Sequence, residues 1–239
     1  MARVGGFLVS NSLFTTVLVT LILIGLAFLV ERVLGGVFGT HPLQRVAETI
    51  IEPLWKFVRS ILDDEKAASA VFPYIATFFI FIFIANFVEI LPGFLGSFGI
   101  WHESSKGLKY ELIPLLRSPS TDLNTTVALA LVSVGITQIF AIRFIGFGKY
   151  ISKFISFRSP LKAFLGIFEA IGEISKVLSF SFRLFGNMFA GSVLLLVMGF
   201  LAPFVIPLPF MALELFVGLV QALIFSMLTL MFIKAALSY

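Results

Sequence analysis

The sequence has 239 residues, of which 59% are hydrophobic and only 13% are charged. A soluble domain of this size does not need so much apolar surface, so the composition indicates a polytopic membrane protein. The absence of cysteine excludes disulfides and thiol chemistry, and the net charge of +4 comes without a basic face interleaved with aromatic side chains, so no nucleic-acid partner is expected.

Three apolar runs in the first two thirds of the chain are typical of membrane-spanning helices. They cover residues 13–30, 71–91 and 123–142, each close to the roughly 20 residues that a helix needs to cross a bilayer. The residues before the first run lack the basic region and cleavage site of a signal peptide, so we expect this run to be retained as a helix.

The segment 43–62 has a different pattern, with apolar side chains at helical spacing and charged side chains between them. The charged positions are Arg45, Glu48, Glu52, Lys56 and Arg59. This pattern predicts an amphipathic helix that lies at the membrane interface with Trp55 as an anchor. An ordinary helix packed on a partner explains the pattern equally well.

The last two helices are expected to be unusually long. Residues 161–201 contain no proline, and a continuous helix over these 41 positions would be roughly 60 Å long, whereas the hydrocarbon layer is about 30 Å thick. Such a helix must protrude, bend or tilt strongly. A proline-rich reversal at 202–209 precedes the second long helix at 210–237.

Basic residues gather in the connectors that follow the first and third apolar runs. By the positive-inside rule both connectors are cytoplasmic, so five crossings leave the N-terminus periplasmic and the C-terminus cytoplasmic. The lack of a presequence and of cysteine favours a bacterial inner (plasma) membrane. We expect one all-α membrane domain, made of 1–42 with the first span, 43–66 with the interfacial helix, 67–117 with the second span and an outer loop, 118–160 with the third span and a basic connector, and 161–239 with a tilted helical hairpin.

An arginine, Arg183, lies inside the long apolar run 161–201. An arginine at the centre of a membrane helix costs about 2.5–3.5 kcal/mol on insertion scales and cannot escape this cost by losing its proton. We therefore expect Arg183 to have a function. Asn187 shares its helix face one turn later, and Ser192 points the opposite way. Glu173 and Lys176 are three positions apart, a spacing that predicts an ion pair.

The return helix carries Glu214 and Gln221, which are seven residues apart and share a face. An antiparallel hairpin makes both of them candidate neighbours of Arg183, Asn187 and Ser192. A buried Arg183–Glu214 pair that holds the two helices together is the structural alternative. The amides of Asn187 and Gln221 and the hydroxyl of Ser192 are more polar groups than one ion pair needs. They favour a proton or ion path through an apolar wall.

Polar residues also stand near the ends of the second and third spans. Asp122 comes just before the third span. A role as the N-cap of that helix is sufficient to explain it, and a position at a water-filled vestibule is the more specific hypothesis. Asn86, near the end of the second span, is expected to bond to a neighbouring helix. The sequence contains no phosphate loop, metal-ligand cluster or nucleophile–base pair, so we expect neither an enzyme site nor a cofactor or metal.

The motif Arg183-Leu-Phe-Gly-Asn187-Met-Phe-Ala-Gly191 resembles the signature of subunit a of the F-type ATP synthase, bacterial type. The likeness extends over most of the chain, because Pro119-Ser-Thr-Asp122-Leu-Asn124-Thr, Asn86 with Leu91-Pro92-Gly93, and Gln221-Ala-Leu-Ile-Phe also resemble the family at the expected places.

The resemblance implies an all-α stator subunit whose two long, tilted helices lie along a ring of c subunits, with the subunit b stator stalk and other ATP synthase subunits as further partners. Protons would enter from the periplasm through one half-channel, neutralise a ring carboxylate and leave into the cytoplasm through a second half-channel. Arg183 would separate the two half-channels, with Gln221 beside it and Asn187 lining the polar path. The subunit itself would hold no nucleotide site.

One position departs from the family pattern. The family commonly has Glu or His nine residues after the arginine, where this chain has Ser192, and Glu214 occupies the partner position on the last helix. We therefore expect Glu214 to carry proton uptake alone, through ordered water. The further polar residues that we expect at the vestibules are Asp122, Asn124, Asn86, Glu173 and Lys176.

Two other classes of protein compete with this family. A self-contained secondary transporter or ion channel with an intramembrane Arg/Glu site would tend to show internal repeats and broken helices, and no such repeat is visible. A purely structural membrane scaffold would use the same charges to hold its helices together.

Overall fold

The computed structural model describes residues 2–4, 7–9, 11–35, 42–90, 99–103, 110–114, 118–154, 160–202 and 205–237. The helices in these ranges are α1 (Asn11–Gly35), α2 (Pro42–Ile61), α3 (Glu65–Ile90), the short 3-10 helix η1 (Pro119–Thr121), α4 (Leu123–Ile145), α5 (Phe147–Phe154), α6 (Pro160–Leu201) and α7 (Pro207–Leu237). Five of them, α1, α3, α4, α6 and α7, are long and apolar enough to cross a membrane. The predicted all-α, polytopic fold class is therefore confirmed, including the number of spans.

Two short antiparallel hairpins accompany the helices. The first pairs β1 (Ala2–Val4) with β2 (Phe7–Val9), and the second pairs β3 (Gly99–Glu103) with β4 (Tyr110–Pro114). The second hairpin lies in the connector between α3 and α4, for which we expected only a loop. Its strands contain Ile, Trp and Tyr, which favour extended backbone.

Helix ends differ from the expected ones for local reasons. The second span begins earlier than residue 71, because the Asp64 side chain accepts a hydrogen bond from the backbone N–H of Lys66 (3.0 Å) and starts α3 at Glu65. The return helix begins at Pro207, since proline is tolerated in the first turn of a helix. The third span runs to Ile145 and stops at Gly146, whose φ of 90° suits glycine and few other residues.

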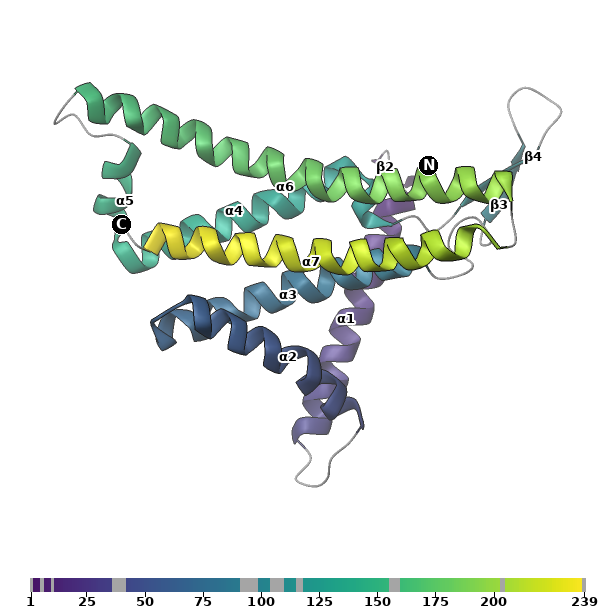
Figure 1. Cartoon of the computed structure of the whole chain (residues 1–239), viewed down its shortest axis with the longest axis horizontal. Coiled ribbons are helices and arrows are strands. Elements are labelled where there is room, and N and C mark those ends of the chain that lie inside the picture. The colour runs from purple at the N-terminus through teal and green to yellow at the C-terminus, as the bar shows by residue number, and fades with distance from the viewer. Residues whose placement is uncertain are drawn as a thin grey trace.

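The long helices α6 and α7 run side by side, with α4 packed against both and α3 on the other side of α7 (Figure 1). The helix α1 runs across the direction that α6 and α7 share (Figure 1). With 42 residues α6 is about 63 Å long, roughly twice the thickness of a hydrocarbon layer. The expected pair of long helices is thus present, and their tilt in a membrane stays a prediction.

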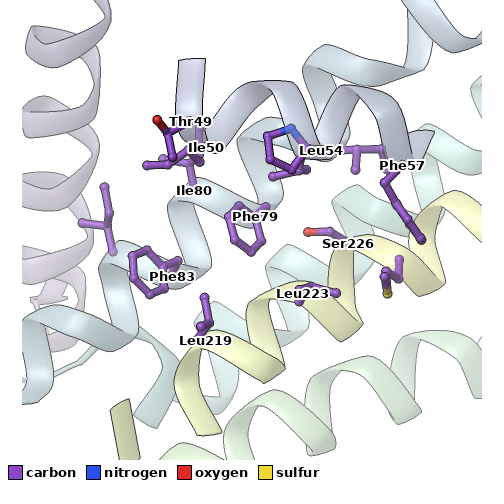
Figure 2. Close-up of a pocket in the computed structure, with 14 residues that line it drawn as sticks. Thr49, Ile50, Leu54, Phe57, Phe79, Ile80, Phe83, Leu219, Leu223 and Ser226 are labelled. Carbon is purple, nitrogen blue, oxygen red and sulfur yellow. The ribbon is translucent and has the colours of Figure 1, made fainter. Parts of the chain in front are cut away.

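The amphipathic helix predicted near the first span is α2. Its apolar face packs on α3 and α7, and its charged face is exposed, with the Nζ of Lys56 only 2.7 Å from Glu52 Oε1. Val58 and Leu62, at and just beyond its end, are buried in the helix bundle. An apolar cavity remains between α2, α3 and α7 (Figure 2).

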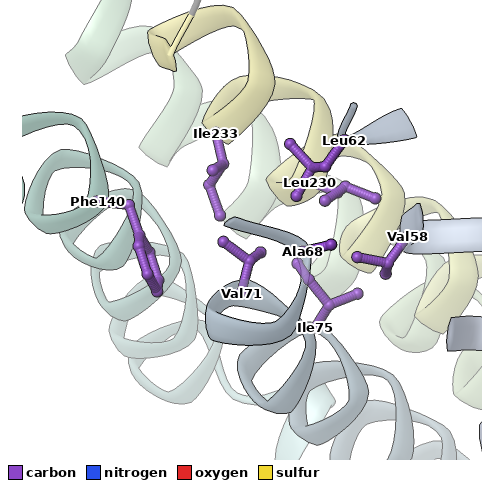
Figure 3. Close-up of a cluster of buried hydrophobic side chains, with 8 residues drawn as sticks. All are labelled: Val58, Leu62, Ala68, Val71, Ile75, Phe140, Leu230 and Ile233. Carbon is purple, nitrogen blue, oxygen red and sulfur yellow. The ribbon is translucent and has the colours of Figure 1, made fainter. Parts of the chain in front are cut away.

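Two clusters of buried apolar side chains join the helices. One unites α2, α3, α4 and α7 through Val58, Leu62, Ala68, Val71, Ile75, Phe140, Leu230 and Ile233 (Figure 3). The other unites α3, α4, α6 and α7 through Phe78, Phe79, Ile82, Ala130, Phe180, Leu184, Ala222 and Phe225. Both clusters use α7, whose buried residues recur every three or four positions from Glu214 to Ile233.

Polar contacts join the same helices inside the apolar interior. Asn86 on α3 is buried, donates to the carbonyl of Gly218 on α7 (3.3 Å) and accepts from the hydroxyl of Ser120 in η1 (2.7 Å). The small Gly218 permits this approach, because a Cβ there would lie 3.1 Å from the Asn86 Cβ. Ser133 on α4 and Thr229 on α7 share a second buried hydrogen bond of 2.8 Å. The expectation that Asn86 bonds to a neighbouring helix is confirmed.

Replacing Asn86 by alanine removes both of its interhelical bonds and leaves the buried Ser120 hydroxyl without its amide acceptor. We expect a loss of about 1–2 kcal/mol of stability, measured as a lower midpoint of thermal unfolding of the chain in mild detergent. The variant Asn124→Ala, at an exposed position in the first turn of α4, is the control. Equal midpoints for the two variants would contradict the role given to Asn86.

Candidate functional site at the α6–α7 hairpin

Arg183 lies near the middle of α6 on the exposed face of the helix. Its Nη2 donates a hydrogen bond to the hydroxyl of Ser179 one turn earlier (3.2 Å), and within the described part of the chain it forms no ion pair. The neighbouring Phe182 is exposed too. The structural alternative, a buried Arg183–Glu214 pair, is therefore absent, and the guanidinium stands on an outward, largely apolar surface.

The predicted approach of Asn187 and Gln221 is found where α6 meets α7. Asn187 Nδ2 donates to Gln221 Oε1 at 2.7 Å, and Gln221 is buried on α7. Asn187 follows Arg183 by one turn. A polar contact between the two long helices thus lies directly beside the arginine.

Glu214 is buried on α7, and both of its carboxylate oxygens are covered. The carboxylate rests against Gly191 of α6, where a Cβ would overlap Oε1 and lie 2.7 Å from Cδ. Gly191 belongs to the motif that carries the family resemblance, but its part in seating Glu214 was not predicted. Ser192 is the next residue along α6, and its hydroxyl donates to the carbonyl of Met188 (2.9 Å).

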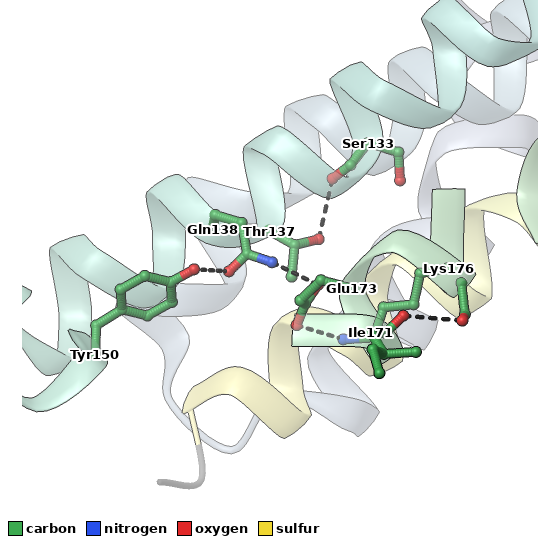
Figure 4. Close-up of polar contacts among 8 residues, drawn as sticks. Ser133, Thr137, Gln138, Tyr150, Ile171, Glu173 and Lys176 are labelled. Carbon is green, nitrogen blue, oxygen red and sulfur yellow. Dashed lines mark hydrogen bonds and ion pairs between the residues drawn. The ribbon is translucent and has the colours of Figure 1, made fainter. Parts of the chain in front are cut away.

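The predicted ion pair of Glu173 and Lys176 is present on α6, with Lys176 Nζ 2.7 Å from Glu173 Oε1 (Figure 4). Sequence reasoning missed two further members of this group. Gln138 on α4 donates through Nε2 to Glu173 Oε2 (2.6 Å), and Tyr150 on α5 donates to Gln138 Oε1 (2.5 Å). No spacing rule links residues on three different helices, so only the fold reveals the chain of contacts.

The same group is partly shielded from solvent. Burial and the nearby carboxylates of Glu173 and Glu169 raise the pKa of the Tyr150 phenol, so Tyr150 keeps its proton and acts as the donor to Gln138. The ammonium of Lys176 also lies over the ring of Phe232 on α7, 4.7 Å from its centroid. Lys176 is therefore held by α6 and α7 together.

Asp122 caps α4, as its position predicted. Its Oδ1 accepts from the backbone N–H of Asn124 (3.0 Å), and its Oδ2 accepts from Ser12 at the start of α1 (2.5 Å). Asn124 is exposed, whereas Asn86 is almost wholly buried as an interhelical contact. Within the described residues no group of three or more His, Cys, Asp or Glu side chains is placed to hold a metal.

The polar residues of the hairpin are spread along α6 and not gathered at one point. Glu173 lies in the half of α6 that follows α5 in the chain, and Gly191, with Glu214 against it, lies in the half that precedes the α6–α7 reversal. From Glu173 to Ser192 the helix rises about 28 Å, close to the thickness of a hydrocarbon layer. Arg183 stands midway between the two ends.

Gly191→Val introduces a side chain into the space that the Glu214 carboxylate fills. We expect it to push α6 and α7 apart near Gln221, which can be measured as disulfide yield between cysteines placed at positions 187 and 221, because the chain has no cysteine of its own. Gly199→Val, where no atom lies within 4 Å of the new Cβ, serves as the control. Equal cross-linking yields in both backgrounds would argue against the close seat of Glu214.

Comparison with known proteins agrees with the family that the sequence resembles. The family model described as ATP synthase A chain matches residues 13–234. The ATP synthase subunit a of Syntrophobacter fumaroxidans is 35% identical over 236 residues, which cover 98% of this chain and 87% of the relative. That of Gloeobacter violaceus is 34% identical over 235 residues, covering 95% of this chain and 83% of the relative. The chain therefore belongs to the ATP synthase A chain family, the family of subunit a of the F-type ATP synthase.

Proposed function

We propose that this multi-pass subunit forms two proton half-channels at its interface with a ring of c subunits and couples proton flow to ring rotation and ATP synthesis. The single observation that carries the proposal is the exposed Arg183, a permanent cation on an apolar helix face without a carboxylate partner among the described residues. A carboxylate that another subunit brings to this charge would stabilise it.

In this proposal Arg183 is the barrier between the half-channels. A carboxylate on the passing ring subunit is held ionised beside the guanidinium and is neutralised only after it has moved away. The fixed positive charge also repels a proton that would cross directly from one half-channel to the other. The Asn187–Gln221 contact supports the surface on which this exchange takes place, because it joins α6 to α7 one turn from Arg183.

The two ends of the hairpin suit the two half-channels. Proton uptake uses Glu214 at the end near the α6–α7 reversal, with the Ser192 hydroxyl nearby on α6 and with Asp122, Asn124 and Asn86 toward the outer vestibule. Release uses the opposite end, where Glu173 and Lys176 line the cytoplasmic vestibule. The separation of these groups along α6, with Arg183 between them, supports this assignment.

Subunit a is a non-catalytic member of the ATP synthase, and other ATP synthase subunits are its partners. We propose more specifically that the c-ring and the subunit b stalk contact this chain, and that it contains no nucleotide site and needs no cofactor. It would lie in a bacterial inner membrane with a periplasmic N-terminus and a cytoplasmic C-terminus, as the distribution of basic residues indicates.

Arg183→Ala and Arg183→Lys should reduce ATP-driven proton pumping to background in inverted membrane vesicles, because alanine removes the barrier and lysine can lose its proton. Assembly should be normal, since Arg183 bonds only to Ser179 of its own helix among the described residues. Copurification of the other subunits measures assembly. Arg143→Ala, at the exposed end of α4, is the control. Pumping by well-assembled Arg183 variants would refute the proposed barrier.

Glu214→Gln keeps the size of the buried side chain but removes its ability to exchange a proton. We expect the initial rate of proton pumping in assembled vesicles to fall at least tenfold, and Glu214→Asp to retain more activity than Glu214→Gln. Glu31→Gln, at an exposed position in the last part of α1, should have no effect. An unchanged rate for Glu214→Gln would remove this carboxylate from the proposed path.

A further inference from the structure

A chain of polar contacts connects α5 and α4 with the half of α6 that precedes Arg183 (Figure 4). The Tyr150 phenol donates to Gln138 Oε1 (2.5 Å), and Gln138 Nε2 donates to Glu173 Oε2 (2.6 Å). The Nζ of Lys176 lies 2.7 Å from the other carboxylate oxygen, Glu173 Oε1. Tyr150 lies outside the candidate membrane spans, whereas Glu173 lies inside the span of α6. The contacts therefore link a connector to the interior of the long hairpin.

The Gln138 amide has one fixed orientation in this group. Its NH2 faces Glu173 Oε2, so its oxygen faces Tyr150 and needs a donor there. The phenol is such a donor, because burial and the carboxylates of Glu173 and Glu169 raise the pKa of Tyr150 and keep it protonated. A rotated amide would turn its oxygen toward the carboxylate, where two acceptors would meet without a proton between them. The phenol therefore holds the amide in the orientation that binds Glu173.

The Glu173 carboxylate is held at both oxygens and is mostly shielded from solvent. The side chains of Glu173 and Lys176 are 15% and 23% exposed. Lys176 is held in turn by the ring of Phe232 on α7, whose centroid lies 4.7 Å from Nζ. An ion pair that is largely removed from water needs further hydrogen bonds to offset its lost hydration, and Gln138 supplies one. Loss of this amide would free the carboxylate to turn away from its present position.

A glycine turn brings Tyr150 to Gln138. In a continuous helix, residues twelve positions apart are separated by about 18 Å along the axis, so their contact requires a change of direction. Gly146 supplies it with a φ of 90°, which few residues other than glycine adopt. Its N–H donates to the Ile142 carbonyl (3.0 Å), and its carbonyl accepts from the Tyr150 N–H (3.1 Å). The turn between α4 and α5 thus sets the position of the phenol.

The position of Glu173 on α6 favours a part in proton release over simple attachment of helices. Glu173 lies ten positions before Arg183, about 15 Å along the helix, whereas Glu214 contacts α6 beyond Arg183. A group that passes a proton on must lie within hydrogen-bond reach of the donor, so its position has to be fixed. Gln138 and Lys176 fix the Glu173 carboxylate in this way.

We propose that Gln138 and Tyr150 are positioning residues for proton release. The Tyr150 phenol fixes the Gln138 amide, and this amide holds the Glu173 carboxylate against Lys176. A proton released by a ring carboxylate then passes by way of Glu173 to water on the cytoplasmic side. Neither Gln138 nor Tyr150 exchanges that proton, since both act through the orientation of Glu173. The inference rests on the proposed function, in which Glu173 lines the release half-channel.

Tyr150→Phe removes one oxygen atom and keeps the ring. ATP-driven pumping in assembled vesicles uses the same half-channel in the reverse direction, and we expect its rate to fall about threefold in Tyr150→Phe and about tenfold in Gln138→Leu. The double variant should pump no more slowly than Gln138→Leu alone, because Tyr150 acts only through the amide. Tyr74→Phe, half-exposed on α3 and in ring contact with Phe140, is the matched control and should pump normally. Copurification of the other subunits measures assembly.

An exchange of the two groups separates positioning from simple attachment of α4 to α6. Gln138→Glu combined with Glu173→Gln allows every hydrogen bond of the group to form. The phenol and the amide at position 173 donate to the carboxylate at position 138, and Lys176 donates to the amide oxygen. The negative charge, however, moves from α6 to α4. We expect normal assembly, with pumping as slow as in Glu173→Gln alone.

Three results would overturn the inference. Wild-type rates in Tyr150→Phe and Gln138→Leu, with slow pumping in Glu173→Gln, would remove the two positioning residues and leave the proposed function standing. This comparison does not depend on whether the exchanged variant assembles. Pumping restored by the exchange would mean that the contacts only attach α4 to α6. A wild-type rate in Glu173→Gln would remove Glu173 from the release half-channel, and the inference with it.

Discussion

Polar groups inside a membrane protein must find partners in the protein, because lipid offers none, and this constraint organises the bundle around α7. Three of its contacts with other helices are hydrogen bonds: Asn86 to the Gly218 carbonyl, Ser133 with Thr229, and Asn187 to Gln221. The apolar side chains that α7 contributes to one core cluster lie between Gln221 and Thr229, and those that it contributes to the other lie just beyond Thr229. The apolar area supplies contact in any register, whereas the hydrogen bonds select one register for α3, α4 and α6 against α7.

Arg183 does not follow this pattern. The amide next to it is joined to α7, and the ion pair of Glu173 and Lys176 is joined to α4 by Gln138, but the guanidinium is directed outward. A rigid hairpin that presents one permanent charge on an apolar face is suited to meeting a moving carboxylate on another subunit. In the proposed mechanism the interior contacts hold α6 in position, and the Arg183 guanidinium interacts with the ring carboxylate at the surface.

Much of this organisation could be predicted from the residues in order. Apolar runs of sufficient length predicted the five spans, the alternation of apolar and charged residues predicted α2, and the cost of an arginine in an apolar helix singled out Arg183. Helical spacing predicted the pairing of Glu173 with Lys176, and an antiparallel hairpin predicted that Gln221 would approach Asn187. These inferences succeeded because each depends on one helix or on two helices joined by a short reversal.

The sequence by itself therefore determined the class of protein, the number of spans and the family, and it singled out the candidate site residues on the long hairpin. Only the tertiary structure decided in which direction the side chains of these residues point and which residues of other helices they contact. It separated Glu214 from Arg183 and set it against Gly191, and it joined Tyr150 and Gln138 to Glu173. The reason is physical: helical periodicity tells which residues share a face, but the rotation and register of each helix follow from packing against all of its neighbours at once.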